Sequence, residues 1–146
     1  MRVIPHRPVL ALAYTGRIAG GRIKEAVAAH GLKPSHSHVL TLLAEQETMS
    51  QQALLEELGV DPSMLVSVLN DLEDDGLATR RRDRADRRRH IVEISVRGRQ
   101  LVARLEESFE IVETELMAAL DDEEIATLTR ILSRIRDPGD NTECGE

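Results

Sequence analysis

Hydrophobic residues recur at helical spacing through the first and last thirds of the chain. Leu, Ile and Val return there every three or four positions, which is the period of an amphipathic helix. The helices predicted from this pattern cover residues 9–30, 36–46, 97–120 and 125–135. The first of them contains Gly16, Gly20 and Gly21, each costing about 1 kcal/mol of intrinsic helicity relative to alanine. That helix therefore needs packing from elsewhere, and a frayed or kinked helix is the alternative.

The ends of these helices carry recognisable signals. Gly31 suits the position just past a helix, and Ser35 suits the N-cap of the next one. The long helix from Arg97 to Leu120 would span roughly 36 Å at 1.5 Å per residue. The acidic run 121–124 favours the start of the last helix, because negative charge there complements the helix dipole. Arg130, Arg134 and Arg136 suit its C-terminal end.

Two shorter helices and a glycine turn are predicted in the middle of the chain. Ser50 is a good N-cap for a helix over 51–58, and Gly59 permits a sharp turn. Asp61 caps a second helix over 62–75, with Pro62 in its first turn, where the missing N–H costs nothing. The inward-facing residues of the two helices are Leu54, Leu55, Leu58, Leu65, Val68, Leu69 and Leu72. Gly76 ends the second helix.

Two strands follow, separated by a polar loop. Residues 77–82 and 90–96 have the composition and alternation of paired strands, and residues 83–89 join them. Helices and hairpin together predict a mostly α protein with a small β-hairpin wing, a winged helix-turn-helix with long dimerisation helices. The chain of 146 residues is 41% hydrophobic, enough for a core, and only 1% aromatic, with Tyr14 and Phe109. A surface that stacks single-stranded bases needs more aromatic residues than this.

Charge is distributed unevenly. The formal net charge is −7, yet residues 80–90 hold seven arginines against two aspartates. A local cationic patch binds phosphate, and the acidic remainder limits indiscriminate binding. One cysteine, Cys144, allows no disulfide within the chain and fits a reducing compartment. Because no stretch is long and apolar enough for a membrane span or a signal peptide, we expect a cytoplasmic protein without membrane contact.

Three stretches resemble the MarR family of winged helix-turn-helix transcription regulators. They are residues 58–63 (LGVDPS), 69–77 (LNDLEDDGL) and 83–98 (DRADRRRHIVEISVRG). The resemblance covers residues 8–136 and implies a homodimer that binds a pseudo-palindromic double-stranded DNA operator. With it we expect an N-terminal arm and dimerisation helix (1–34), a DNA-binding lobe (35–96) and C-terminal dimerisation helices (97–136). Residues 137–146 contain Pro, Gly, Asn and acids, a composition that predicts a disordered tail. Most such regulators are repressors, and many release DNA when a small aromatic or anionic effector binds.

The resemblance also assigns roles to single residues. Asp86 and Arg88 fall on the family's paired aspartate and arginine, where the carboxylate orients a guanidinium that enters the minor groove. Arg84, Arg87 and Arg89 add phosphate or groove contacts. Ser63, Met64 and Ser67, in the first turns of the second short helix, are expected nearest the base edges, where serine bonds bases and methionine contacts a thymine methyl. The helix lacks Arg, Lys and Gln, so DNA shape would carry part of the selectivity. By position alone, the candidates for an effector pocket are Tyr14, Arg17, His38, Leu42 and Arg104.

Other interpretations remain open from the sequence. The main alternative is a winged-helix protein-interaction module without DNA binding, supported by the acidic net charge and by a recognition helix without Arg or Lys. For the arginine run itself, the alternative is a solvated face. His36 and His38 raise the possibility of metal sensing, but their His-x-His spacing on a helix points the rings about 200° apart. No metal site and no cofactor are therefore predicted. No nucleophile with a base, phosphate-binding glycine loop or catalytic carboxylate pair stands out, so we expect no enzyme activity.

Overall fold

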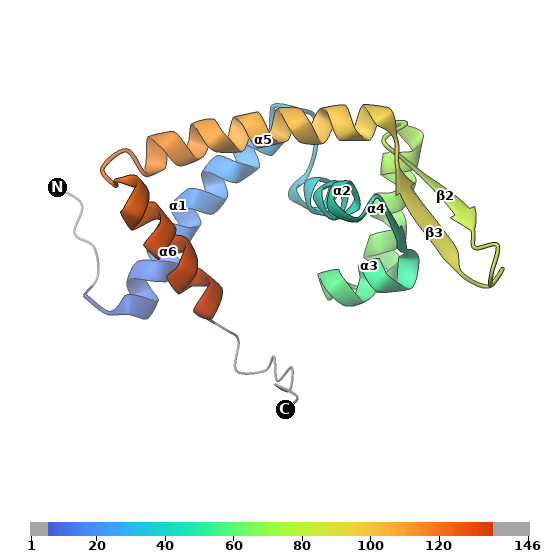
Figure 1. Ribbon diagram of the computed structural model, residues 1–146, viewed down its shortest axis with the longest axis horizontal. Helices are drawn as coiled ribbons and strands as arrows, with labels where there is room; N and C mark the ends of the chain where they lie inside the picture. Colours follow the sequence, from blue (N-terminus) through green and yellow to red (C-terminus); the bar gives the residue numbers. More distant parts are fainter. Residues whose placement is uncertain (1–5, 136–146) are drawn as a thin grey trace. The chain divides into compact units, whose positions relative to one another are not determined.

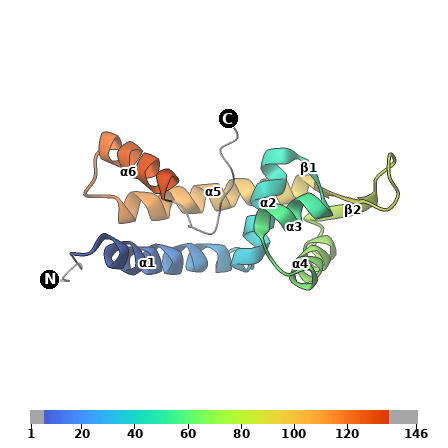
Figure 2. The same ribbon diagram turned by 90° about the horizontal axis from the view of Figure 1, so that it is seen from below.

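The computed structural model describes residues 6–135, which form six α-helices and a three-stranded sheet (Figures 1 and 2). The helices are α1 (Pro8–Ala28), α2 (Pro34–Gln46), α3 (Gln51–Leu58), α4 (Pro62–Asp74), α5 (Val96–Leu116) and α6 (Asp122–Arg134), and the strands are β1 (Thr48–Ser50), β2 (Ala78–Arg82) and β3 (His90–Ile94). The predicted fold class is confirmed. Packing divides the chain into two compact units, one up to Val112 and one from Glu113 onward. Within residues 6–135, every helix is too short or too polar to cross a bilayer.

The first helix is a single α-helix despite its glycines. Pro8 stands in its first turn, where proline's fixed φ favours helix and its missing N–H costs nothing. The helix ends near Gly31, whose φ of +75° lies in the left-handed region. Next to that end, His30 Nε2 lies 2.9 Å from Ser108 Oγ on α5. The arm predicted for the start of the chain lies outside the described residues as far as residue 5.

Helix α2 begins two residues earlier than predicted. Lys33 occupies the N-cap and Pro34 the first helical position, so the prediction of Ser35 as the N-cap was wrong. The reason is that proline already sets the helical φ at the first position. The Lys33 N–H finds its acceptor in His36 Nδ1, 3.2 Å away. Three residues of α2 join the core: Val39, Leu40 and Leu43.

The predicted caps of the two short helices are confirmed. Ser50 Oγ accepts the N–H of Ala53 at 3.0 Å, and Asp61 Oδ1 accepts that of Ser63 at 2.8 Å. Gly59 adopts φ +60° between the helices, a conformation that side chains with a Cβ rarely take. The buried stripe of α4 is also as predicted: Leu65, Val68, Leu69 and Leu72. These side chains meet Leu40, Leu43 and Leu54 in one aliphatic core.

The sheet has a strand that the sequence pattern did not predict. Its order is β1-β3-β2, with both pairings antiparallel. The short β1 pairs Thr48 with Glu93 and Ser50 with Ile91, and so joins the end of α2 and the start of α3 to the hairpin. Glu47, between the end of α2 and the start of β1, adopts a positive φ of 65°. Figure 1 shows the β2–β3 hairpin projecting away from α2, α3 and α4.

The long helix starts and ends earlier than predicted. Val96, predicted as strand, is the first residue of α5, and Ser95 caps it by accepting the Gly98 N–H at 3.0 Å. The helix stops at Leu116, so Leu120 lies in the following turn, contrary to prediction. The chain must turn there because Asp121 and Glu124 already form the capping box of α6. That box confirms the predicted start of the last helix, whereas Arg136 and the tail 137–146 lie outside the described residues.

Gly98 marks the closest approach between α5 and the hairpin. A Cβ at this position would overlap the backbone oxygen of Leu77 and lie 2.7 Å from the Cγ1 of Ile94. The same corner is fastened by Ser95, whose backbone N–H donates to the Leu77 oxygen (3.0 Å) and whose hydroxyl donates to the Gly76 oxygen (2.7 Å). The base of the hairpin is therefore held against α5 by the hydrogen bonds of Ser95 and by a close approach that only glycine at position 98 permits.

Candidate DNA-binding interface

The loop at the tip of the hairpin is an ordered turn built on its own aspartates. The Asp83 N–H donates to the Arg89 oxygen (2.8 Å), and the Arg89 N–H donates to the Asp86 oxygen (2.9 Å). Asp83 Oδ1 accepts the N–H of Ala85 at 3.0 Å. Side chains of aspartate commonly stabilise turns in this way. The loop, residues 83–89, which we call the wing loop, therefore has internal bonds that fix its path.

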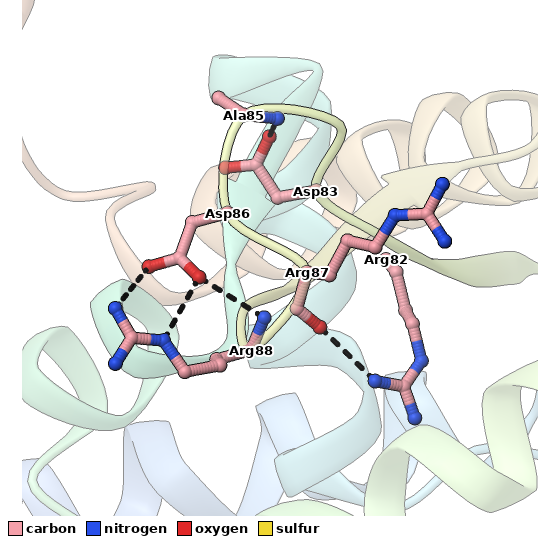
Figure 3. A network of polar contacts seen from close by, with 6 residues as sticks. All are labelled: Arg82, Asp83, Ala85, Asp86, Arg87 and Arg88. Carbon is pink, nitrogen blue, oxygen red and sulfur yellow. Dashed lines mark hydrogen bonds and ion pairs between the residues drawn. The ribbon is translucent and has the colours of Figure 1, made fainter.

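Asp86 holds Arg88 in the wing loop (Figure 3). Its Oδ1 accepts from both the backbone N–H and the Nε of Arg88 at 3.1 Å, and its Oδ2 lies 3.4 Å from Nη2. The hydrogen bond from the Arg88 side chain, more than the backbone bond, lowers the pKa of Asp86 below its ordinary value. The Arg88 side chain is nevertheless 91% exposed. The guanidinium is oriented by the carboxylate and open to an anionic partner.

The other arginines of the run divide into two groups. Arg80 bonds back to α4: its N–H donates to Glu73 Oε2 (3.0 Å) and its guanidinium to Asn70 Oδ1. Arg81 Nε lies 4.0 Å from Glu93 Oε2 on the neighbouring strand. By contrast, Arg82 donates to the backbone oxygen of Arg87 (3.0 Å), within the loop. A recess of about 470 Å³ opens between four residues of the loop and its stem: Arg82, Asp83, Arg84 and Arg87.

The exposed side of α4 lies in the same lobe. Ser63, Met64 and Ser67 are all exposed, as their predicted role requires. Ser63 is not free, because its hydroxyl donates to Asp61 Oδ1 at 2.6 Å, and this bond lowers the pKa of Asp61. Val66 is also exposed, at 38%. Val66 was not among the residues predicted to face DNA, although its place about 100° from Leu65, outside the buried stripe, indicated exposure.

A cavity of about 520 Å³ lies between the wing loop and the helix-turn-helix. It is lined by the start of α3, the start of α4 and the end of the wing loop. Its residues are Ser50, Gln51, Gln52, Leu55, Pro62, Leu65, Arg88, Arg89 and His90. Two helix N-termini and two arginines at one cavity favour an anion there. Gln51 and Gln52 were not predicted as site residues, because their position beside the arginines follows only from the tertiary fold.

The five effector candidates fall in different surroundings. Arg17 Cζ lies 6.0 Å above the ring of Tyr14, both on α1. His38 borders a cavity of about 230 Å³ formed with α3 and α4, next to Val60, Met64 and Val68. The remaining two candidates sit apart from that cavity's lining: Leu42 packs against the core, and Arg104 is an exposed residue of α5. Of the five, His38 alone lines one of the cavities described above, and their joint role stays a prediction.

The two histidines considered for metal sensing have separate contacts. His36 Nε2 lies 3.0 Å from Asp71 Oδ2 on α4, whereas His38 borders the cavity just described. Among residues 6–135, no three His, Cys, Asp or Glu side chains gather closely enough to hold a metal ion. His36 therefore contributes to the packing of α2 on α4.

A helix-turn-helix followed by a hairpin with an arginine-bearing loop defines a winged helix-turn-helix protein. Residues 30–89 match the model of the MarR family. Over 122 residues the chain is 33% identical to a protein from Thauera aromatica described as a putative transcriptional regulatory protein for the hcr operon, covering 82% of this chain and 74% of that one. The chain belongs to the MarR family of transcriptional regulators.

Two solved structures share the fold. One is CouR from Rhodococcus jostii RHA1 bound to p-coumaroyl-CoA, 24% identical with a TM-score of 0.77, covering 94% of this chain and 97% of that one. The other is a mutant MarR from E. coli complexed with operator DNA, 19% identical with a TM-score of 0.74, covering 86% and 91%. The resemblance suspected from the sequence is thereby confirmed for family and fold.

Proposed function

We propose that this protein is a homodimeric regulator that binds double-stranded DNA at specific sites, most simply as a repressor. The observation that carries the proposal is Arg88, fixed by Asp86 yet 91% exposed, on a loop that extends from the lobe bearing α4. The wing loop would enter a minor groove, and Arg84, Arg87 and Arg89 would neutralise phosphates. Ser63, Met64 and Ser67 would face the major groove. No catalytic activity is proposed.

The proposal of a homodimer is supported by apolar side chains that the single chain leaves exposed. Helix α1 exposes Val9 and Leu10, α5 exposes Ile111, and no residue of α6 is buried. Exposed apolar surface of this kind marks protein contacts. We propose that the helices before residue 35 and after residue 96 pair with a second copy, while residues 35–96 bind DNA. A two-fold pair meets half-sites about 34–36 Å apart, one helical turn.

Release of DNA by a small molecule is a separate part of the proposal. It is supported by the solved relative CouR, whose structure holds p-coumaroyl-CoA, and by the cavity beside His38. A small aromatic or anionic compound is the proposed effector class. The five candidates Tyr14, Arg17, His38, Leu42 and Arg104 stay predictions, to be tested by screening metabolites for release of bound DNA.

The decisive experiment measures DNA binding and its dependence on salt. Genomic fragments captured by the purified protein serve as probes in fluorescence anisotropy between low and moderate salt. Because phosphate contacts release counterions, log affinity should fall steeply with log salt concentration. Arg88→Ala should lower affinity by about tenfold or more, while Arg130→Ala, which removes a cation from α6, should not.

One observation favours a second candidate, a winged-helix module that binds protein. The C-terminal half of α4 carries Asp71, Glu73 and Asp74 and no cation, which opposes its approach to DNA. A flat salt response together with unchanged affinity in Arg88→Ala would support this candidate and contradict the first. A partner protein bound through the wing loop would then be expected.

A further inference from the structure

The outward side of α4 changes character halfway along the helix. Successive residues of an α-helix are turned by 100°, and the stripe from Leu65 to Leu72 is buried. The exposed residues outside this stripe are Ser63, Met64, Val66 and Ser67 in the first two turns, and Asn70, Asp71, Glu73 and Asp74 in the last two turns. The first half is neutral and the second is acidic. Only the first half suits the floor of a groove walled by phosphates.

The polar groups of α4 are largely engaged within the protein. The Ser63 hydroxyl donates to Asp61. Asn70 Oδ1 accepts from the Arg80 guanidinium, so pairing both ends of its amide with adenine would compete with that bond. The helix contains no Arg, Lys or Gln, the side chains that most often read guanine or adenine. Ser67 is the remaining hydroxyl on this side of the first half.

Two apolar side chains stand exposed beside these serines. Met64 is 45% exposed and Val66 is 38% exposed, on a helix whose other apolar residues are buried. Because they are two positions apart, Met64 and Val66 are turned about 200° from each other. They lie on opposite flanks of the face that Ser63 and Ser67 occupy, so each would reach a different thymine, and Met64 also borders the cavity beside His38. In the major groove, the C5 methyl of thymine is the group that apolar side chains contact. Burial of a methyl against them would stabilise the complex through the hydrophobic effect.

We infer that α4 recognises thymine methyl groups through Met64 and Val66, with Ser67 as an accessory hydrogen-bonding residue. The inference rests on the proposed DNA binding and specifies how sequence is read. Phosphate affinity comes from the wing loop, whereas discrimination between bases comes from apolar contacts in the first two turns of α4. The operator half-sites should then contain thymines, and high affinity should depend on the methyl groups of these thymines rather than on their hydrogen-bonding edges.

Replacing thymine by uracil tests this directly, because it removes the methyl and leaves base pairing unchanged. The probe is the duplex most enriched by the full-length protein from a random-sequence library, resynthesised with deoxyuridine at one thymine at a time. Affinity should fall about fourfold for each contacted thymine, the effect of one buried methyl-sized group. Uracil placed in the flanking base pairs is the control and should have no effect.

Variants of the protein connect that loss to the two side chains. Met64→Ala or Val66→Ala should weaken binding to the thymine duplex. At the thymine that the replaced side chain contacts, each variant protein should then bind the thymine and uracil duplexes with equal affinity. Val96→Ala, a matched change at a residue 73% exposed on α5, should keep the wild-type discrimination.

Three results would overturn the inference in different ways. Equal affinity for thymine and uracil duplexes at every position shows that methyl groups are not read. Unchanged discrimination in both α4 variants assigns the effect to DNA shape instead of these side chains. If no duplex is enriched at all, the proposed DNA binding fails first, and the inference fails with it.

Discussion

The helix-turn-helix lobe and the flanking helices contain the same types of aliphatic residue, but the lobe buries them and the flanking helices expose them. In the lobe, Leu40, Leu54 and Leu69 are fully buried, and strands, caps and helices enclose one core. On α1 and α6, side chains such as Val9 and Leu132 are 67% and 43% exposed, although they follow the same helical period. Periodicity therefore identifies an apolar face but does not tell whether that face is covered by its own chain.

This difference separates what a single chain can stabilise from what requires a partner. Each buried leucine of the lobe contributes roughly 1.5–3 kcal/mol relative to an exposed one. The exposed apolar residues of α1 and α6 contribute nothing comparable until something covers them. We therefore expect substitutions in the lobe to lower stability at any protein concentration, and substitutions on α6 to act mainly through association.

The largest effect is expected for Leu69→Ala. Leu69 is at the centre of the core, at 0% exposure, and truncating such a leucine typically costs about 2–5 kcal/mol because it loses burial and leaves a cavity. Urea unfolding followed by circular dichroism measures the change. Leu132→Ala is the matched control and should cost far less when the protein is dilute enough to be monomeric, because the Leu132 side chain is then exposed. Equal costs for the two variants would remove the contrast between lobe and flanking helix.

A second, smaller contrast compares two helical glycines. Gly98→Ala places a Cβ against the Leu77 oxygen and Ile94, and overpacking of this kind costs about 1–3 kcal/mol. Gly20→Ala on α1 has nothing within 4 Å of its new Cβ and should instead gain up to about 1 kcal/mol from helix propensity. Thermal unfolding of both variants decides the signs. Destabilisation by Gly20→Ala would mean that another chain packs closely on α1.

Much of the lobe could be predicted because its signals are local. Ser50, Gly59 and Asp61 act within a few residues of themselves, through caps and a left-handed turn, so sequence alone identified them. The strand β1 could not be found that way, because three residues carry no pattern and their pairing partners on β3, residues 91–93, are distant in the chain. Likewise Leu120 continues the hydrophobic period of α5, but α5 ends before it because Asp121 and Glu124 form the capping box that starts α6.

The site was predicted in its residue types more fully than in its geometry. Seven neighbouring arginines look equivalent in sequence, yet Arg80 and Arg81 turn to carboxylates of the protein while Arg88 stays exposed. Val66 was not predicted as a site residue, because its 38% exposure follows from the packing of α4 and not from its residue type. The effector candidates were chosen by position, and only His38 borders a cavity described above. Which arginines pair within the protein and which residues border a cavity depend on distances between elements, and the sequence does not supply those distances.

The smallest expected change in free energy is that of Leu132→Ala on self-association, and it tests the flanking helices most directly. Leu132→Ala should leave the unfolding of dilute, monomeric protein nearly unchanged. It should weaken self-association by about 1 kcal/mol or more, because an interface loses apolar contact on both copies. Sedimentation velocity over a range of protein concentrations measures this shift. Ala126→Ser, a change of similar scale at an exposed position of the same helix, is the control. If Leu132→Ala dissociates no more readily than that control, the apolar face of α6 is not where two copies meet.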